Sequence, residues 1–217
     1  MIDLHTHTLL SDGGLLPSEL VHRAKEIGYE AICLSDHADG SILDFVVLRT
    51  IEVSKRLSLI EGIEVIPGVE LTHIPPILIP EMVEHSRRLG AKLILLHGET
   101  LVEPVAKGTN LAGLRCKIDI LAHPGLLTLE EAILAKERGI YLEITTRKGH
   151  SLTNGHVVKV AKETGALLVL NTDAHEPEDL TSQEIASKIA QGAGLEASEF
   201  EGLLTNSKNL IKRVMGQ

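Results

Sequence analysis

Six of the eleven histidines in this 217-residue sequence stand at the ends of apolar segments, where acidic residues accompany them. The histidines are His5, His7, His37, His97, His123 and His175, and the acidic residues are Asp12, Glu70 and Asp173. Imidazole nitrogens and carboxylate oxygens, in a chain with only two cysteines, form a ligand set suited to Zn²⁺, Mn²⁺ or Fe²⁺. These residue types predict a metal centre and argue against a structural cysteine site.

The spacing of two pairs supports this prediction. His5 and His7 are two residues apart on an expected strand, and Asp173 and His175 repeat that spacing. Because side chains two apart on an extended chain point the same way, both members of a pair can reach one ion. The candidate ligands are too many for one tetrahedral ion, so we expect two or three divalent metal ions, with Glu70 as the bridging carboxylate.

Each candidate ligand also has a simpler interpretation. A single histidine at a strand end is more often a hydrogen-bonded surface or core residue than a metal ligand. The whole set on one face would, however, bury several charges and donors without partners, which costs several kcal/mol per ion unless a cation neutralises them. The set therefore favours metal binding where no single member does.

Other residues of similar type lack this placement. Five further histidines do not share it. His22 and His85 lie within helical patterns and are expected to be solvated, His73 either fills a loop or lines the rim of the site, and His150 and His156 flank the loop after residues 140–144. Among them His150, in the loop after residues 140–144, is the strongest candidate for a role in the site. Asp36 and Glu99 adjoin candidate ligands, where each either orients an imidazole or is a solvated loop charge.

Arg147 follows the apolar segment 140–144, beside Lys148, in a chain that is otherwise acidic. A guanidinium matches a phosphate group with two parallel hydrogen bonds. We therefore take Arg147 as the candidate phosphate clamp. The alternative is an arginine that is solvated or paired with a surface carboxylate.

Seven β-type segments must position these residues. Most are continuous runs of Val, Ile and Leu, which are typical of strands buried on both faces of a parallel sheet. The expected strands span residues 2–5, 31–35, 64–69, 92–97, 118–123, 140–144 and 166–171.

Amphipathic helical patterns lie between the expected strands. The clearest begins at Pro17, and another begins with a capping box formed by Thr128 and Glu131. Five glycines each directly precede a strand, and we expect them to end helices in the left-handed conformation: Gly28, Gly62, Gly90, Gly139 and Gly165.

The alternation of strands and helices, with no linker, predicts a single α/β domain over residues 1–217. C-terminal helices are expected over residues 182–215, with a second capping box at Ser198 and Glu201. No glycine-rich phosphate loop follows the first strand, which favours a barrel of seven or eight parallel strands over a doubly wound sheet. In such a barrel the carboxyl ends of all strands meet at one face, so the candidate ligands between residues 5 and 175 converge there.

Composition limits the classes of partner. A formal charge of −9 and only four aromatic residues disfavour a nucleic acid polymer. The absence of an apolar run of about 18 residues, and of a basic or apolar leader at residues 1–5, predicts a cytoplasmic protein with no membrane partner. Cys33 and Cys116 are expected to be buried and reduced. No pattern indicates an oligomeric state.

Taken in order, the motifs resemble those of the polymerase and histidinol phosphatase (PHP) superfamily, and the match extends from residue 2 to about residue 176. The motifs are His5-Thr6-His7, Ser11-Asp12-Gly13, Ser35-Asp36-His37, Gly68-Val69-Glu70, His97, Ala122-His123-Pro124 and Thr172-Asp173-Ala174-His175. The resemblance implies a distorted (β/α)7 barrel of mainly parallel strands. It also implies a trinuclear centre of zinc, manganese or iron that hydrolyses phosphoesters.

The resemblance also implies a ligand set by position. It places His5, His7, Glu70 and Asp173 on one ion, Glu70, His97 and His123 on a second, and Asp12, His37 and His175 on a third. Some relatives have a histidine in place of Asp12.

Such a centre lowers the pKa of a bridging water, so that a metal-bridging hydroxide becomes the nucleophile while Arg147 stabilises charge on the phosphoryl oxygens. Arg147 and Glu70 are thus the candidate catalytic residues. The acidic chain and its small size favour a small phosphomonoester as substrate, with histidinol phosphate and a nucleotide monophosphate as candidates.

Two rival functions remain open. An amidohydrolase-type C–N hydrolase also uses His-x-His on its first strand, but it is expected to have eight strands and a bridging lysine at a mid-barrel strand end, where this sequence has Glu70 and His97. A non-catalytic PHP-like accessory or binding domain, as in some DNA polymerases and ribonuclease P, is expected to have lost ligands or, for an RNA subunit, to be basic. Neither feature is present in this sequence.

Overall fold

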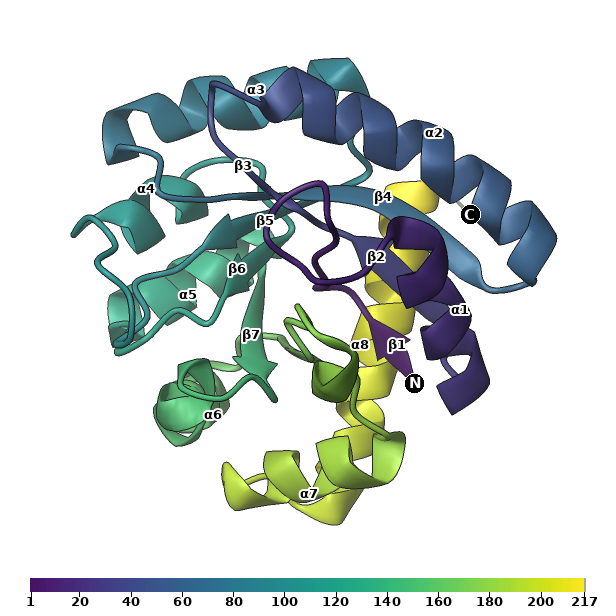
Figure 1. Ribbon diagram of the computed structural model, residues 1–217. Coiled ribbons are helices and arrows are strands. Elements are labelled where there is room, and N and C mark those ends of the chain that lie inside the picture. Colours follow the sequence, from purple (N-terminus) through teal and green to yellow (C-terminus); the bar gives the residue numbers. More distant parts are fainter. Residues whose placement is uncertain (217) are drawn as a thin grey trace.

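Strands and helices alternate around a nearly closed barrel in the computed structural model, which describes residues 1–216 (Figure 1). The strands are β1 (Ile2–Asp3), β2 (Ala31–Leu34), β3 (His37–Ala38), β4 (Glu64–Leu71), β5 (Leu93–His97), β6 (Ile120–Ala122), β7 (Tyr141–Thr145) and β8 (Leu168–Asn171). The α-helices are α1 (Pro17–Ile27), α2 (Leu43–Glu61), α3 (Ile79–Leu89), α4 (Thr109–Leu114), α5 (Leu129–Arg138), α6 (Asn154–Thr164), α7 (Gln183–Gly192) and α8 (Ala197–Met215). Short 3₁₀ turns lie at η1 (Pro76–Leu78), η2 (His150–Thr153) and η3 (Pro177–Asp179). All seven expected strands are present, and Gln217, the last residue of the expected domain, lies outside the described residues.

The strands form one parallel sheet in the order β1-β2-β4-β5-β6-β7-β8. An isolated parallel bridge between Thr6 and Ala174 joins its two edges, and the amide of Asp173 donates to the carbonyl of His5 at 2.9 Å. Because the strands are parallel, all their carboxyl ends face the same end of the barrel. The predicted distorted (β/α)7 barrel is confirmed.

The sequence analysis missed β3. This strand has two residues and pairs with Glu70 and Leu71 of β4. It follows β2 after only two residues, so its pattern merges with that of the longer strand. The pairing places His37 directly beside Glu70.

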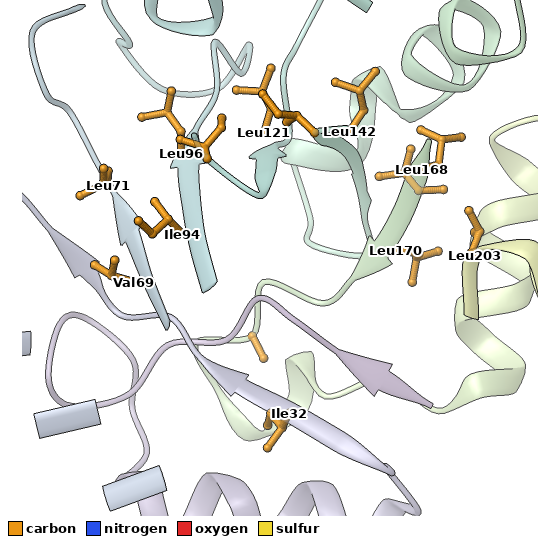
Figure 2. Close-up of a cluster of buried hydrophobic side chains, with 14 of the residues drawn as sticks. Ile32, Val69, Leu71, Ile94, Leu96, Leu121, Leu142, Leu168, Leu170 and Leu203 are labelled. Carbon is orange, nitrogen blue, oxygen red and sulfur yellow. The ribbon is translucent and has the colours of Figure 1, made fainter. Parts of the chain in front are cut away.

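Two apolar layers hold the barrel together. Alternate strand residues such as Ile94, Leu96 and Leu121 face the surrounding helices (Figure 2). The intervening residues fill the interior of the barrel, where Leu210 and Ile211 of α8 join them. Helix α8 thus covers the amino-terminal end of the barrel and leaves the carboxyl end open for a site.

The expected helix ends are mostly confirmed. The five glycines that precede strands all have positive φ, between 64° and 104°. Thr128 and Glu131 form the expected capping box. The box expected at Ser198 and Glu201 is wrong, because Glu196 and Glu199 form it and α8 begins before Ser198.

Cys33 is buried in the barrel, whereas Cys116 is half-buried, and both are free thiols. The expectation of two buried cysteines therefore holds only for Cys33. Gly68 on the neighbouring strand makes room for the Cys33 sulfur, since a Cβ at Gly68 would lie 2.5 Å from Sγ. Within residues 1–216, no helix has the length and apolar character needed to span a bilayer.

Candidate metal centre

The nine candidate ligands meet at the carboxyl end of the barrel, around a pocket of about 410 Å³. Six of them line the pocket, and three are fully buried against those six: His5, His7 and Glu70. The elements that carry the ligands lie far apart in the sequence. His5 and His7 follow β1, Asp12 precedes α1, His37 begins β3, Glu70 lies in β4, His97 ends β5, His123 follows β6, and Asp173 and His175 follow β8.

Glu70 occupies the centre of the cluster. Its Oε2 atom lies 2.7 Å from Nδ1 of His37, 3.3 Å from Nε2 of His5 and 3.6 Å from Nε2 of His7. Its Oε1 atom lies 3.5 Å from Nε2 of His123. A bridging carboxylate needs this kind of central position.

Four overlapping sets within the cluster have ligand atoms close enough together to hold an ion. All ligand atoms within a set lie within 4.8 Å of one another. The sets are His5, His7 and Glu70; His5, His123 and Asp173; Glu70, His97 and His123; and His7, Asp12, His37 and His175. Each of the nine candidates belongs to at least one set.

Several of the buried polar atoms at this point have no hydrogen-bond partner. They include Nε2 of His5, both ring nitrogens of His7, Oε1 of Glu70 and Oδ1 of Asp173. Leaving such a group unsatisfied in the interior costs about 1–3 kcal/mol. Divalent cations would satisfy the carboxylate oxygens and one nitrogen of each imidazole, because these are the atoms with which such ions are bound. The residues present therefore fit bound metal ions.

The central carboxylate of Glu70 is ionised, and the neighbouring imidazole of His5 is charged, when no cation is bound. Burial opposes ionisation of Glu70, but the neighbouring His5 and His37 outweigh burial and hold the pKa of Glu70 well below its usual range. Burial likewise opposes protonation of His5, yet the carboxylates of Glu143 and Glu70 raise the pKa of His5 well above its ordinary value. The proton on His5 thus offsets part of the negative charge of the neighbouring carboxylates.

Two other buried imidazoles are neutral. Burial, together with the positive charges of His37 and His5, lowers the pKa of His7 well below its usual value. Burial and the neighbouring His97 do the same to His123. Burial also raises the pKa of Asp173 to about 6. A neutral imidazole is the form that binds a metal ion.

Hydrogen bonds orient several rings so that Nε2 faces the cluster. Nδ1 of His97 donates to the carbonyl of Gly98 at 3.2 Å, and Nδ1 of His175 donates to the carbonyl of Asp173 at 3.0 Å. Because a carbonyl can only accept, the proton lies on Nδ1 in both rings. In the neutral form of each ring, the Nε2 lone pair of His97 or His175 is then available to a ligand.

Glu143, on β7, is a supporting residue to which the sequence analysis gave no role. Its Oε1 atom lies 2.9 Å from Nδ1 of His5 and accepts a hydrogen bond from the side-chain amide of Asn171 at 2.7 Å. Its Oε2 atom accepts a hydrogen bond from the amide of His123 at 3.1 Å. The Glu143 side chain is fully buried. One carboxylate thus positions two candidate ligands.

The backbone is strained at two of the candidate ligands. His123 has a φ of 25° and Asp173 a φ of 54°, a region that side-chain-bearing residues rarely adopt. Such conformations cost about 1–3 kcal/mol and occur mainly at functional sites. Sequence patterns give no signal for this strain.

Arg147 lies at the wall of the same pocket, as expected. Its Nη1 atom donates to the carbonyl of Asp173 at 3.2 Å and to Oδ2 of Asp179 at 3.1 Å. Its Nε atom is 3.6 Å from Oδ2 of Asp173. The guanidinium is therefore held beside the cluster and is not freely solvated. It does pair with the partly exposed carboxylate of Asp179, as the alternative interpretation expected, and its role as a phosphate clamp stays a prediction.

The pocket also contains Glu103, which the sequence analysis missed. Oε2 of Glu103 lies 3.1 Å from Nε2 of His97, and Oε1 lies 3.3 Å from Nε2 of His150. These imidazoles hold the pKa of Glu103 far below its usual range. His150 is buried, and its ring stacks on that of His123 with 4.2 Å between the ring centroids. It lies in the pocket, where the sequence analysis considered it a candidate for a role in the site. His73 also lines the pocket and does not merely fill a loop.

The loops around the pocket are organised by Asp36 and Glu99. Asp36 accepts hydrogen bonds from the amide of Thr8 at 2.7 Å and from the hydroxyl of Ser11 at 2.9 Å. Glu99 accepts hydrogen bonds from the backbone amides of Gly108 at 2.9 Å and of Asn110 at 3.0 Å. Neither carboxylate orients an imidazole or is simply solvated, so neither of the two expectations for them holds.

The other histidines lie away from the pocket. His22 on α1 pairs with Glu61 with its side chain 58% exposed, and His85 on α3 pairs with Asp44. His156 contacts the carbonyl of Leu127 at 2.8 Å through Nε2.

Fold and site together define a (β/α) barrel with a histidine and carboxylate cluster at the end where barrel enzymes carry their active sites. Residues 3–99 match the family model described as the PHP domain. The chain belongs to the PHP domain family, as its motifs predicted.

The similar proteins differ in whether their names state an activity. An uncharacterized protein of Methanocaldococcus jannaschii is 47% identical over 215 residues, which cover 98% of this chain and 99% of that protein. A protein of Thermoanaerobacter named as a probable phosphatase is 28% identical over 90% of this chain and 87% of its own. Among solved structures, a chain in the structure of archaeal ribonuclease P with mature tRNA is 17% identical, covers 99% of this chain and 91% of its own, and has a TM-score of 0.76. This last likeness shows the fold alone.

Proposed function

We propose that this protein is a metal-dependent phosphoesterase that hydrolyses a small phosphomonoester. The observation that carries the proposal is the cluster of buried imidazole and carboxylate atoms without hydrogen-bond partners, at the open end of the barrel. The probable phosphatase among the relatives supports the reaction class.

The proposed ligands are the nine residues of the cluster. Glu70, His97 and His123 would hold one ion. Asp12, His37 and His175 would hold another, and His7 is close enough to be a fourth ligand of that ion. His5, His7, Glu70 and Asp173 would hold the third, with Glu70 shared between ions. Zn²⁺, Mn²⁺ and Fe²⁺ all suit this donor set.

Bound divalent cations would supply Lewis-acid activation of water and neutralisation of phosphoryl charge. The chain itself would bind and orient the substrate. Arg147 would bind phosphoryl oxygens through the N–H groups that its bonds to Asp173 and Asp179 leave free. Glu143 would keep the His5 ring in place, and the buried floor of the site would exclude bulk water.

The shape and charge of the pocket favour a small substrate. A volume of about 410 Å³ matches a phosphorylated metabolite. The net charge of −9 disfavours a polyanion, and Arg147 is the only arginine or lysine among the described residues that line this pocket. An RNA-binding or assembly role is less well supported, because the ligand set is complete.

A C–N hydrolase is the remaining rival. No lysine is among the described residues that line the pocket, whereas such an enzyme would use one as a bridge. An amide substrate should accordingly give no turnover.

The experiment that tests the proposal measures metal and activity together. The purified protein is analysed for bound metals by mass spectrometry and assayed against phosphomonoesters, phosphodiesters and amides, before and after chelation. We expect bound divalent metal, hydrolysis of phosphomonoesters, loss of activity with chelator and recovery on adding metal back. Activity that survives complete removal of metal would end the proposal, as would turnover of amides alone.

A further inference from the structure

A second concave site lies at the opposite, amino-terminal end of the barrel. We call it the basal groove; it has a volume of about 610 Å³. The ends of α3, α5 and α8 and the starts of β5 and β6 form its walls, and its charged lining residues are Arg87, Lys92, Lys117, Asp119, Arg138 and Arg213. No ligand of the proposed metal centre is among its lining residues.

The basal groove is basic in an acidic protein. Its lining contains five cationic side chains and one carboxylate, that of Asp119, whereas the chain as a whole carries −9. A concave surface of one charge sign focuses the field and attracts ligands of the opposite sign. The groove therefore favours an anion that the rest of the surface repels.

Two of its arginines are held in fixed positions. Arg87 donates to Oδ2 of Asp119 and, through Nη1, to the carbonyl of Lys92 at 2.8 Å. Arg213 donates to the carbonyl of Gly139 at 2.7 Å and lies over the ring of Tyr141, 5.4 Å from its centroid. Asp119 is 6% exposed, so its carboxylate lies beneath the surface of the groove and neutralises part of the positive charge of Arg87 and Arg213. The two guanidinium groups remain at the surface of the groove.

The other three cations have no anionic partner among residues 1–216. No ion pair or side-chain hydrogen bond of Lys92, Lys117 or Arg138 occurs within this part of the chain, and all three side chains are exposed. Elsewhere on the surface, lysines such as Lys25, Lys162 and Lys188 pair with glutamates. Some cations elsewhere, such as Lys55, Lys107 and Lys148, also have no ion pair among the described residues, so what distinguishes the basal groove is that three such cations line one hollow.

Helix geometry explains part of this convergence. In the barrel the carboxyl ends of α3 and α5 point to the basal end, and basic residues in a last turn offset the partial negative charge there. That effect accounts for Arg87 and Arg138. Lys92 and Lys117 lie outside the helices, so the helix dipoles do not explain their presence.

We propose that the basal groove binds the phosphate chain of a small polyanion, either a nucleoside triphosphate or an inorganic polyphosphate. Phosphate oxygens accept charge-assisted hydrogen bonds from guanidinium and ammonium groups, and guanidinium binds them two at a time. The volume of about 610 Å³ matches a ligand of this size. A polynucleotide would extend past the groove onto the acidic surface.

Calorimetric titration of the intact protein with tripolyphosphate, and separately with ATP, tests this site. A chelator is present throughout so that the pocket at the other end of the barrel holds no metal. We expect saturable binding that weakens as salt is added. The double variant Lys117→Ala/Arg138→Ala should lose at least about tenfold in affinity. Equal affinity for the two anions indicates recognition of the phosphate chain alone, whereas tighter binding of ATP adds a contact to the base or ribose; both results support the site.

Two control variants keep this test separate from that of the proposed phosphoesterase. Arg56→Ala/Lys159→Ala removes the same two charges from exposed positions outside the basal groove and should bind as the parent protein does. Arg147→Ala alters the other pocket and should also leave the affinity unchanged.

Four results would overturn the proposal. They are no saturable binding of either anion, equal losses in Lys117→Ala/Arg138→Ala and in Arg56→Ala/Lys159→Ala, loss of binding in Arg147→Ala, and tight binding of an oligoribonucleotide without binding of tripolyphosphate. Because the side chains of Lys117 and Arg138 are exposed, we expect the double variant to fold as the parent protein does. An unchanged melting temperature would show that its loss of binding does not come from misfolding.

Discussion

Nδ1 of His5 lies 2.9 Å from Oε1 of Glu143, and neither side chain is exposed to solvent. The contact leaves Nε2 of His5 facing Glu70 at 3.3 Å and Asp173 at 3.5 Å. A residue on β7 thus decides how a residue after β1 presents its ring to the cluster. A carboxylate in this position also makes the imidazole a better ligand.

Replacing Glu143 by glutamine should weaken metal binding by about 10–100-fold, because the carboxamide cannot satisfy His5, Asn171 and the amide of His123 together. Competition with a chromogenic chelator measures the affinity. Glu137→Gln, an exposed change on α5, is the matched control. Metal affinity equal to that of the parent protein would show that Glu143 does not position His5.

His123→Ala should lower the metal content and the rate of phosphoester hydrolysis while the barrel still folds. The imidazole contacts Glu70 and Asp173 through Nε2 and stacks on the ring of His150. Mass spectrometry of the purified variant gives the metal content, circular dichroism reports the fold, and His22→Ala is the control at an exposed position. A fully metallated, fully active His123→Ala protein would contradict the ligand assignment.

Metal affinity should increase as the pH rises through the neutral range. Although burial opposes protonation, neighbouring carboxylates raise the pKa values of His5, His37 and His97 above the ordinary value, so these rings hold protons near neutrality when no cation is bound. A metal ion must displace those protons, and low pH therefore competes with binding. Titrations in buffers of different protonation enthalpy should reveal proton release, and chelator competition at pH 6, 7 and 8 should give rising affinity. Affinity that is flat or falls with rising pH would contradict the prediction.

Arg147→Ala should lower kcat/KM for a phosphomonoester by about 10²–10³-fold, the usual effect of removing one group that stabilises transition-state charge. Arg147→Lys should recover only part of the loss, because an ammonium cannot make two parallel hydrogen bonds to a phosphate group. Steady-state kinetics at saturating metal measures both variants, and Arg88→Ala on the surface of α3 is the control. Full activity in Arg147→Lys would show that only a positive charge is needed.

Glu103→Gln should strengthen inhibition by inorganic phosphate. The carboxylate lies in the pocket between His97 and His150, and those imidazoles keep its pKa low, so it is negatively charged at neutral pH. Removing a charge that is 38% exposed should lower the inhibition constant by about fivefold, equivalent to about 1 kcal/mol. Glu130→Gln, an exposed change on α5, serves as the control. Weaker inhibition in Glu103→Gln would indicate that the carboxylate helps to bind the anion.

Local sequence patterns were enough to predict the elements of the barrel other than the two-residue strand β3. Continuous aliphatic runs identified the strands, and glycines such as Gly28 and Gly139 identified helix ends, because these signals depend on neighbouring residues only. The positions of His97 and His123 at strand ends then followed from parallel topology. The incorrect capping box at Ser198 shows the limit of such patterns. Glu196, two residues earlier, is the N-cap residue of α8 and forms the capping box with Glu199.

Only the closed tertiary structure decided which distant groups touch. The link of Glu143 to His5, the approach of Glu103 to His97 and the left-handed backbone of Asp173 all depend on how strands and loops meet after the bridge between Thr6 and Ala174 closes the sheet. The cations of the basal groove likewise come from separate elements that only the completed barrel brings together. Residue types and their periodicity are local properties of the chain, whereas contacts across a barrel are set by the packing of the whole molecule.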